Sequence, residues 1–163
     1  MALAAPWEQL AQHADLTAAA AECNDASAAA LPAASGERLG RATRAMRLGD
    51  WLAAERVLGE EVKERPGGCW LALDLRAACC LQRGRHDLAL DDAMQCTKLN
   101  PDWARGWARL GAAQLCLGHA RAAASAYRQG LSLDGGSREM QLGLKLAQAA
   151  LAAQGSRRKA MRH

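Results

Sequence analysis

The sequence predicts an all-α protein, an α-solenoid of three helix-turn-helix repeats followed by a C-terminal capping helix. Three observations lead to this fold class: a helix-favouring composition, a turn glycine that recurs at steps of 35 and 34 residues, and small residues in register with that glycine. With 163 residues, half of them apolar, the chain can bury one core of ordinary size. A single domain is therefore expected.

The composition favours helix and a mildly basic surface. Phenylalanine is absent and aromatic residues reach only 4%, so side chains that strands prefer are scarce, whereas alanine and leucine dominate. The formal net charge is +4 and the sequence pI is about 8.9. This weak basicity favours acidic partners and does not require nucleic acid.

Several function classes receive no support from the sequence. Charges interrupt every stretch that approaches the roughly 20 apolar residues of a membrane span, so no membrane segment is predicted. The first residues lack the basic region of a signal peptide and acids follow them, which predicts a cytoplasmic or nuclear location. Basic residues are scattered without an aromatic stacking platform, so nucleic-acid binding is not expected.

Catalytic and metal chemistry also lack a pattern. The four histidines lie at turns or near the termini, which leaves no arrangement of nucleophile, base and orienting acid. The six cysteines form neither a paired zinc pattern nor a disulfide framework, and we expect reduced structural thiols. We therefore predict no enzyme activity, no cofactor, no metal site and no small-molecule substrate. The cysteines stand at positions 23, 69, 79, 80, 96 and 116.

The repeats become visible when the turn glycines Gly49, Gly84 and Gly118 are aligned. Two small-residue columns, a third column of mixed size and a closing column of proline or glycine then fall into the same register. These columns hold Ala42, Ala77 and Gly111; Ala54, Ala89 and Ala123; Leu58, Ala93 and Tyr127; and Pro66, Pro101 and Gly135.

The third unit carries the signature of a tetratricopeptide repeat. Its residues Trp107, Leu110 and Gly111 open the W-x₂-L-G pattern, and Ala123 and Tyr127 continue it with the expected spacing. Small residues in this signature let the two helices of a repeat approach closely, and larger side chains fill the remaining gaps. Core positions are therefore predicted for Trp51, Trp107 and Tyr127.

The repeats predict helices at 36–48, 51–64, 70–83, 86–98, 103–116 and 120–132, with a capping helix at 137–154. Asp50, Asp102 and Ser137 are candidate caps. The corresponding segments are an Ala-rich helix and linker over 1–34, repeats over 35–69, 70–103 and 104–136, the capping helix, and a basic tail over 155–163. A capping helix is expected because a stack of repeats leaves its last apolar face exposed.

The stretch from Leu71 to Leu146 resembles the repeats of the heat-shock organising co-chaperones of the stress-inducible phosphoprotein type. The resemblance rests on Arg76 to Cys79, on the Pro-Asp-Trp segment that runs from Pro101 to Ala113, and on Ala126 to Leu131. It implies a concave groove that binds the acidic Glu-Glu-Val-Asp tail of heat-shock seventy and ninety chaperones through five clamp side chains.

Two of the five clamp positions match the family. Arg105 stands in place of the family's lysine, and Arg109 matches its arginine; Leu39, Thr43 and Leu75 replace a lysine and two asparagines. The arginines lie four residues apart on one helix face, so an anion should sit near them. Two alternatives remain open: an acidic peptide, or internal pairing with acids such as Asp74 and Asp102. The candidate peptide-binding residues are Arg105, Arg109, Leu39, Thr43, Leu75 and Asp74.

The resemblance and the groove columns together predict a co-chaperone-like adaptor that binds an acidic or mixed apolar and acidic peptide. Apolar residues fill columns that usually face the groove, which suggests a ligand held partly by hydrophobic contact. The alternative is a structural scaffold whose groove is filled by its own N-terminal helix, expected from Trp7 to about Ala21, or by a neighbouring copy. The apolar groove columns hold Leu39, Met46, Leu71, Leu75 and Leu115.

Overall fold

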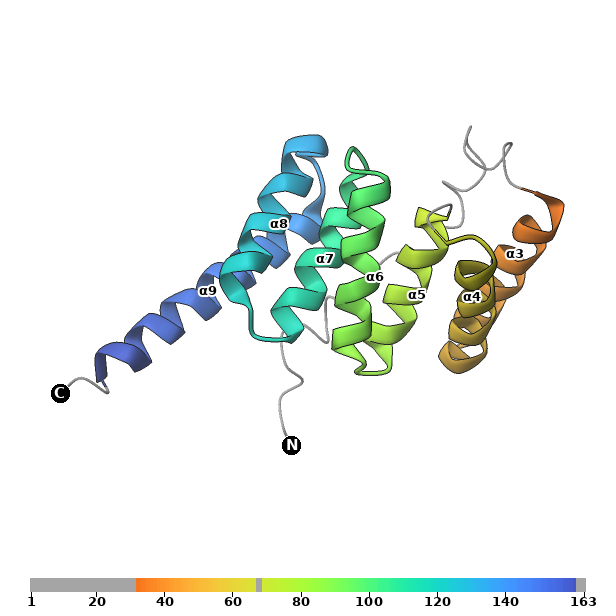
Figure 1. The fold of residues 1–163 in the computed structure, drawn as a ribbon. Coiled ribbons are helices and arrows are strands. Elements are labelled where there is room, and N and C mark those ends of the chain that lie inside the picture. The colour runs from red at the N-terminus through yellow and green to blue at the C-terminus, as the bar shows by residue number, and fades with distance from the viewer. Residues whose placement is uncertain (1–31, 67–68, 161–163) are drawn as a thin grey trace.

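The computed structural model describes residues 32–66 and 69–160, with side chains described through Ser156. These residues form helices that follow one another along a solenoid, arranged as three antiparallel pairs and one final helix (Figure 1). The helices are α3 (Ala33–Arg47), α4 (Trp51–Glu64), α5 (Trp70–Gln82), α6 (His86–Leu99), α7 (Ala104–Cys116), α8 (Ala120–Leu133) and α9 (Arg138–Ala160). The all-α solenoid of three repeats with a capping helix is confirmed.

The turn inside each repeat is built in the same way. Gly49, Gly84 and Gly118 have φ angles of 76°, 71° and 78°, a left-handed conformation that glycine adopts without steric cost. In each turn the residue after the glycine donates its backbone N–H to the carbonyl five residues earlier, at 2.8–2.9 Å. This matching geometry explains why the three glycines align in the sequence.

Small residues bring the paired helices together, as the repeat pattern predicts. Ala42, Ala54 and Ala123 are fully buried, and Tyr127 packs against Gly111. A Cβ added at Gly111 would lie 2.9 Å from the Tyr127 ring, which is closer than real Cβ atoms approach. Because glycine leaves this space, the aromatic ring can fill the gap between α7 and α8.

The predicted core role of the two tryptophans is only partly met. Tyr127 is buried, but Trp51 and Trp107 are half-buried. The indole Nε1 of Trp107 donates to the carbonyl of Pro101 at 2.7 Å, which keeps one edge of its ring beside the turn at the molecular surface. Trp107 therefore supports the loop before α7 and contributes only part of its ring to the core.

Helix ends agree with two of the three predicted caps. Asp50 accepts a hydrogen bond from the N–H of Ala53 at 3.0 Å, and Ser137 accepts from the N–H of Met140 at 3.4 Å. The prediction for Asp102 is wrong, because α7 begins one residue later and its N-cap, Trp103, provides no side-chain hydrogen bond. Trp103 instead packs against Trp70, with ring centroids 4.5 Å apart.

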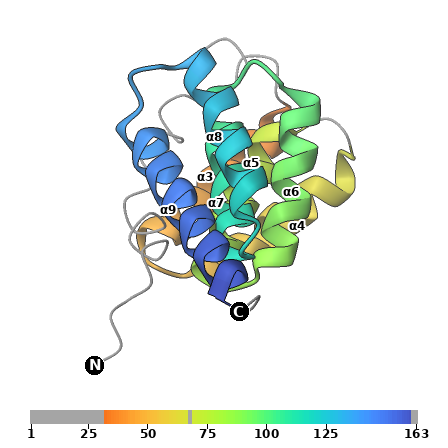
Figure 2. The ribbon, with the colours of Figure 1, turned by 90° about the vertical axis from the view of Figure 1, so that its left-hand side faces the viewer.

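The capping helix α9 packs on α8 and also contacts α7, as the view in Figure 2 shows. Met140 and Ala147 are buried in this contact, and Leu144, Leu146 and Leu151 are partly buried. Leu142 and Ala149, although apolar, are exposed.

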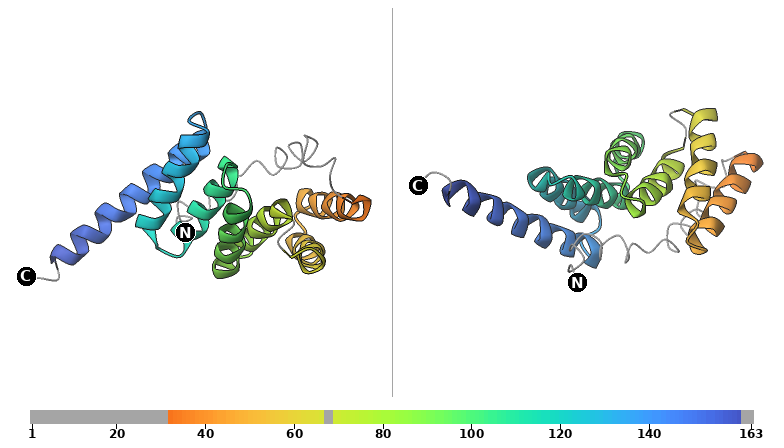
Figure 3. Two further views of the ribbon diagram at one scale, coloured as in Figure 1. Left: turned by 45° about the horizontal axis from the view of Figure 1, so that its top comes forward. Right: turned by 90° about the horizontal axis from the view of Figure 1, so that it is seen from below.

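The helix α9 is longer than predicted. It continues through Ala160, so residues 155–160, expected as part of a basic tail, are helical, and the last turns project past α7 and α8 (Figures 1 and 3). At the other end, α3 begins earlier than expected, directly after Pro32, whose carbonyl accepts from the backbone of Ser35 and Gly36.

The predicted helix from Trp7 to about Ala21 and the last residues of the basic tail lie outside the described residues. None of the helices that the structure describes is long and apolar enough to cross a bilayer.

Candidate functional site

The candidate site lies where the first turn of α7 meets the start of α9. The Pro-Asp-Trp segment positions α7, because the Trp103 ring packs against Trp70 at a tilt of 60° and the indole N–H of Trp107 donates to the Pro101 carbonyl. Gly106 then lets α7 approach α6, since a Cβ at this position would lie 3.3–3.5 Å from Trp103, Cys96 and Thr97. These contacts of Trp103, Gly106 and Trp107 hold the first turn of α7, which carries Arg105, in place.

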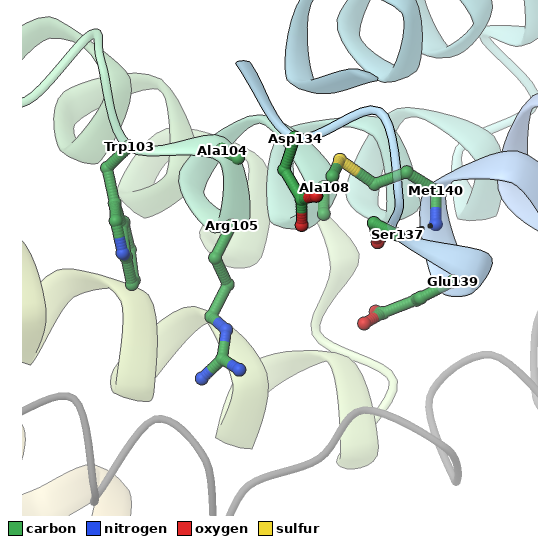
Figure 4. A pocket seen from close by; sticks show the side chains of 8 residues that line it. All are labelled: Trp103, Ala104, Arg105, Ala108, Asp134, Ser137, Glu139 and Met140. Carbon is green, nitrogen blue, oxygen red and sulfur yellow. Dashed lines mark hydrogen bonds between the residues drawn. The ribbon is translucent and has the colours of Figure 1, made fainter. Parts of the chain in front are cut away.

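Arg105 lines a cavity of about 250 Å³ between α7 and α9. The wall from α7 also contains Trp103, Ala104 and Ala108, and the opposite wall comes from the α8–α9 turn and the first turn of α9. Figure 4 shows the side chains of Arg105 and Glu139 projecting into the same space from these two walls. The opposite wall consists of Asp134, Ser137, Glu139 and Met140.

Arg109, the second predicted clamp arginine, is buried and paired inside the protein. The residue is only 6% exposed, and its Nε donates to Oδ1 of the fully buried Asp74 at 3.0 Å. Burial alone would lower the pKa of Arg109, but the charge of Asp74 and the hydrogen bond outweigh it, and the pKa lies above its ordinary value. For Arg109, the internal alternative of pairing with Asp74 is the one that the structure contains.

The apolar groove positions are also buried. Leu39 and Leu75 are 5% and 0% exposed and belong to the core shared by α3, α4 and α5. The expectation that they present open apolar surface is wrong. Leu75 lies on α5, which contacts α3, α4, α6 and α7 and has ten of its thirteen residues buried, and Leu39 packs into the same core from α3. The other three apolar groove columns, Met46, Leu71 and Leu115, are buried as well.

Thr43 is half-buried on α3 and donates its hydroxyl to the carbonyl of Gly40 at 3.0 Å. It lies on the first helix of the solenoid, whereas Arg105 lies on α7 beside the final helix. Of the six candidate peptide-binding residues, Arg105 is the one that lines the cavity, and Asp74 joins Arg109 beneath it.

The sequence reasoning missed the wall contributed by α9. Asp134, Glu139 and Met140 lie beyond the third repeat, so the repeat pattern assigns them no role. The signal that could have found Glu139 was its place in the first turn of the predicted capping helix, two residues after the capping Ser137. The first turn of α9 lies beside the start of α7, which is the first helix of the third repeat.

The buried thiols are not poised for nucleophilic chemistry. None of the five cysteines in the described part of the chain forms a disulfide. Burial raises the pKa of Cys79 to about 12 and that of Cys80 to about 11, so both are protonated at neutral pH. Within residues 32–66 and 69–156, no three histidine, cysteine or carboxylate side chains gather as they would around a metal ion.

A second cavity, of about 380 Å³, lies between the α7–α8 turn and the later part of α9. The described residues of its wall carry no charge, so they offer apolar contacts and no anchor for an acidic group. It is lined by Leu115, Cys116, Gly118, Leu146, Ala149, Ala150 and Ala153.

The repeats, the glycine turns and the close helix pairs give the described part of the chain a tetratricopeptide-repeat fold. Its sequence resembles the heat-shock organising co-chaperones. The heat shock protein sti1 homolog of Schizosaccharomyces pombe is 47% identical over 75 residues, which is 46% of this chain and 13% of the relative. The Hsp70-Hsp90 organizing protein of Triticum aestivum is 46% identical over 78 residues, 48% of this chain and 13% of that protein. No protein-family model matches the chain.

Solved structures support the fold. The Sgt2 TPR domain from Aspergillus fumigatus has a TM-score of 0.72 at 24% identity. The match covers 77% of this chain and 83% of the Sgt2 chain. The first TPR of Spaghetti (RPAP3) bound to the HSP90 peptide SRMEEVD has a TM-score of 0.69 at 19% identity, covering 72% and 93%. The second TPR domain of human RPAP3, in complex with the HSP70 peptide SGPTIEEVD, has a TM-score of 0.67 at 20% identity, covering 71% and 95%. At these identities the likeness concerns the fold alone.

Proposed function

We propose that the chain is a non-enzymatic adaptor module that binds an acidic peptide segment of a partner protein, with Arg105 as the anchoring cation. The observation that carries the proposal is the position of Arg105 on the wall of a cavity between two helices. A guanidinium group recognises carboxylates well because its donors form a planar fork. Arg109 is buried and paired with Asp74, so it holds α7 in place and does not anchor the ligand.

The comparisons suggest the class of partner. Curated relatives of this chain are named as heat-shock organising proteins, and similarly folded domains bind heat-shock chaperone peptides with acidic ends. We therefore propose that the partner segment is an acidic C-terminal tail of the heat-shock chaperone kind. The matched stretch spans only 13% of the first relatives' own length, so their wider activities are not assumed for this chain.

Titration calorimetry with the peptide SRMEEVD tests the proposal. A charge-assisted hydrogen bond contributes about 1.5–3 kcal/mol, so Arg105→Ala should weaken binding roughly ten- to hundredfold. Arg121→Ala is the matched control, because it removes the same charge from an exposed position on α8. Binding should also weaken as salt is added.

No measurable binding by the unsubstituted chain would refute the proposed function. Equal losses in the two arginine variants would reduce the interaction to a non-specific attraction between a basic protein and an acidic peptide.

A second candidate function is a scaffold whose groove is occupied by the chain's own N-terminal segment. Residues 1–31 contain four acidic side chains and no lysine or arginine, although the whole chain has a net charge of +4. Replacing these four acids by their amides in the full chain should then strengthen peptide binding. Unchanged affinity would contradict this alternative. The acids are Glu8, Asp15, Glu22 and Asp25.

A further inference from the structure

The cavity beside Arg105 has two walls of opposite charge. Arg105 stands on the α7 wall, and Asp134 and Glu139 stand on the wall formed by the α8–α9 turn and α9. The described residues that line the cavity include one basic side chain and two acidic side chains, which formally contribute one positive and two negative charges. A purely acidic ligand therefore meets one attractive and two repulsive groups.

The carboxylate of Glu139 faces the inside of the repeat. Its charge helps to raise the pKa of Arg109 on α7 and, after the larger effect of burial, that of Tyr127 on α8. Its side chain is half-buried and projects into the space that Arg105 also enters (Figure 4). A ligand in contact with Arg105 consequently lies in the field of Glu139.

The carboxylate of Asp134 is held at the edge of the same cavity. Its Oδ1 accepts a hydrogen bond from the N–H of Gly136 at 3.1 Å within the α8–α9 turn. This bond restrains the side chain, so the second negative charge lies at the exposed edge of the cavity wall.

We propose that Asp134 and Glu139 make the Arg105 cavity selective for an acidic peptide segment that also carries a basic side chain. This inference rests on the proposed function and specifies the chemistry of its ligand. The acidic group of such a segment contacts Arg105, and its basic side chain approaches the α9 wall. The same wall disfavours a segment that contains acids alone.

Two known ligands of similarly folded domains differ in their basic residues, and the first of them serves as a probe. The HSP90 peptide SRMEEVD contains an arginine, and the HSP70 peptide SGPTIEEVD contains no basic residue. A synthetic peptide SQMEEVD, which differs from the first only in that arginine, isolates the effect of the basic side chain. The full chain should bind SRMEEVD more tightly than SQMEEVD, by roughly two- to fivefold for each exposed charge pair formed.

The variants Glu139→Gln and Asp134→Asn remove the charges and keep the shapes of the side chains. Together they should abolish the preference for SRMEEVD and strengthen the binding of SQMEEVD. Glu60→Gln is the matched control, because it removes a negative charge from an exposed position on α4, and it should leave the preference intact. The preference should also decrease at high salt.

Equal binding of the two matched peptides by the unsubstituted chain, or a preference that persists in the double variant, overturns the inference. These outcomes leave the proposed function standing as long as Arg105→Ala still weakens both peptides. If the unsubstituted chain binds neither peptide, the proposed function fails, and the selectivity argument fails with it.

Discussion

Arg109 and Asp74 form an ion pair in which both side chains are almost completely buried. The pair joins α7 to α5, so it connects the third repeat to the second across 35 positions of the chain. A buried pair of this kind gives little net stability compared with apolar residues, but losing one partner leaves the other charge without compensation. Arg109 is therefore a structural residue beneath the cavity, and Arg105 is the residue at its surface.

We expect Arg109→Ala to lower the free energy of unfolding by about 3–5 kcal/mol, because the carboxylate of Asp74 would remain buried and unpaired. The double variant Arg109→Met with Asp74→Leu should recover most of the loss, since it removes both charges at similar volume. Urea denaturation of the two variants and the unsubstituted chain measures the difference. A single variant as stable as the unsubstituted chain would show that Asp74 is compensated in another way.

The capping helix α9 packs closely against the third repeat at two glycines. A Cβ at Gly143 would overlap the ring of Tyr127, and a Cβ at Gly130 would overlap the sulfur of Met140. Because Tyr127 is itself enclosed against Gly111, its ring has no free space into which it could move. These contacts place the first turns of α9, including Glu139, beside the start of α7.

Gly143→Ala should destabilise the protein by roughly 1–3 kcal/mol, because the added methyl group forces α9 away from Tyr127. Gly155→Ala is the matched control on the same helix, where nothing lies within 4 Å of the added Cβ. There the substitution should be neutral or stabilising by up to about 1 kcal/mol, since alanine favours helix more than glycine does. Thermal unfolding of the two variants checks the contrast, and equal shifts would show that α9 does not dock through Gly143.

The whole molecule buries several ionisable groups in their neutral form. The pKa of Cys79 is raised to about 12 and that of Cys80 to about 11, and burial also raises the pKa values of Cys96 and Tyr127. Thiols in the unfolded chain ionise near pH 8.5. The unfolded state therefore releases these protons at lower pH than the folded state.

This difference predicts that stability is unaffected by the thiols below about pH 8 and decreases as the pH rises from about 9 towards 12. Urea midpoints measured at about pH 7.5 and about pH 10 should show the decrease. The variant Cys79→Ala with Cys80→Ala should show a smaller decrease, because two of the groups are removed. The same pH dependence in both proteins would mean that other groups are responsible for it.

The helices, their order and the repeat register could be predicted from the amino-acid sequence. These features are local: a left-handed glycine ends the first helix of each repeat, and alanine or glycine recurs where paired helices meet. The same local signals located the caps at Asp50 and Ser137. The family resemblance of the Pro-Asp-Trp segment singled out Arg105, which lines the cavity.

The surroundings of each candidate site residue became visible only in the folded chain. Arg105 and Arg109 share a helix face in the sequence pattern, yet one lines a cavity and the other is enclosed by α5 and paired with Asp74. Leu75 belongs to a groove column but is buried, and Glu139 enters the site from outside the repeats. Burial and charge pairing depend on how closely neighbouring helices pack. The periodicity of one segment of the chain does not specify the distances between helices.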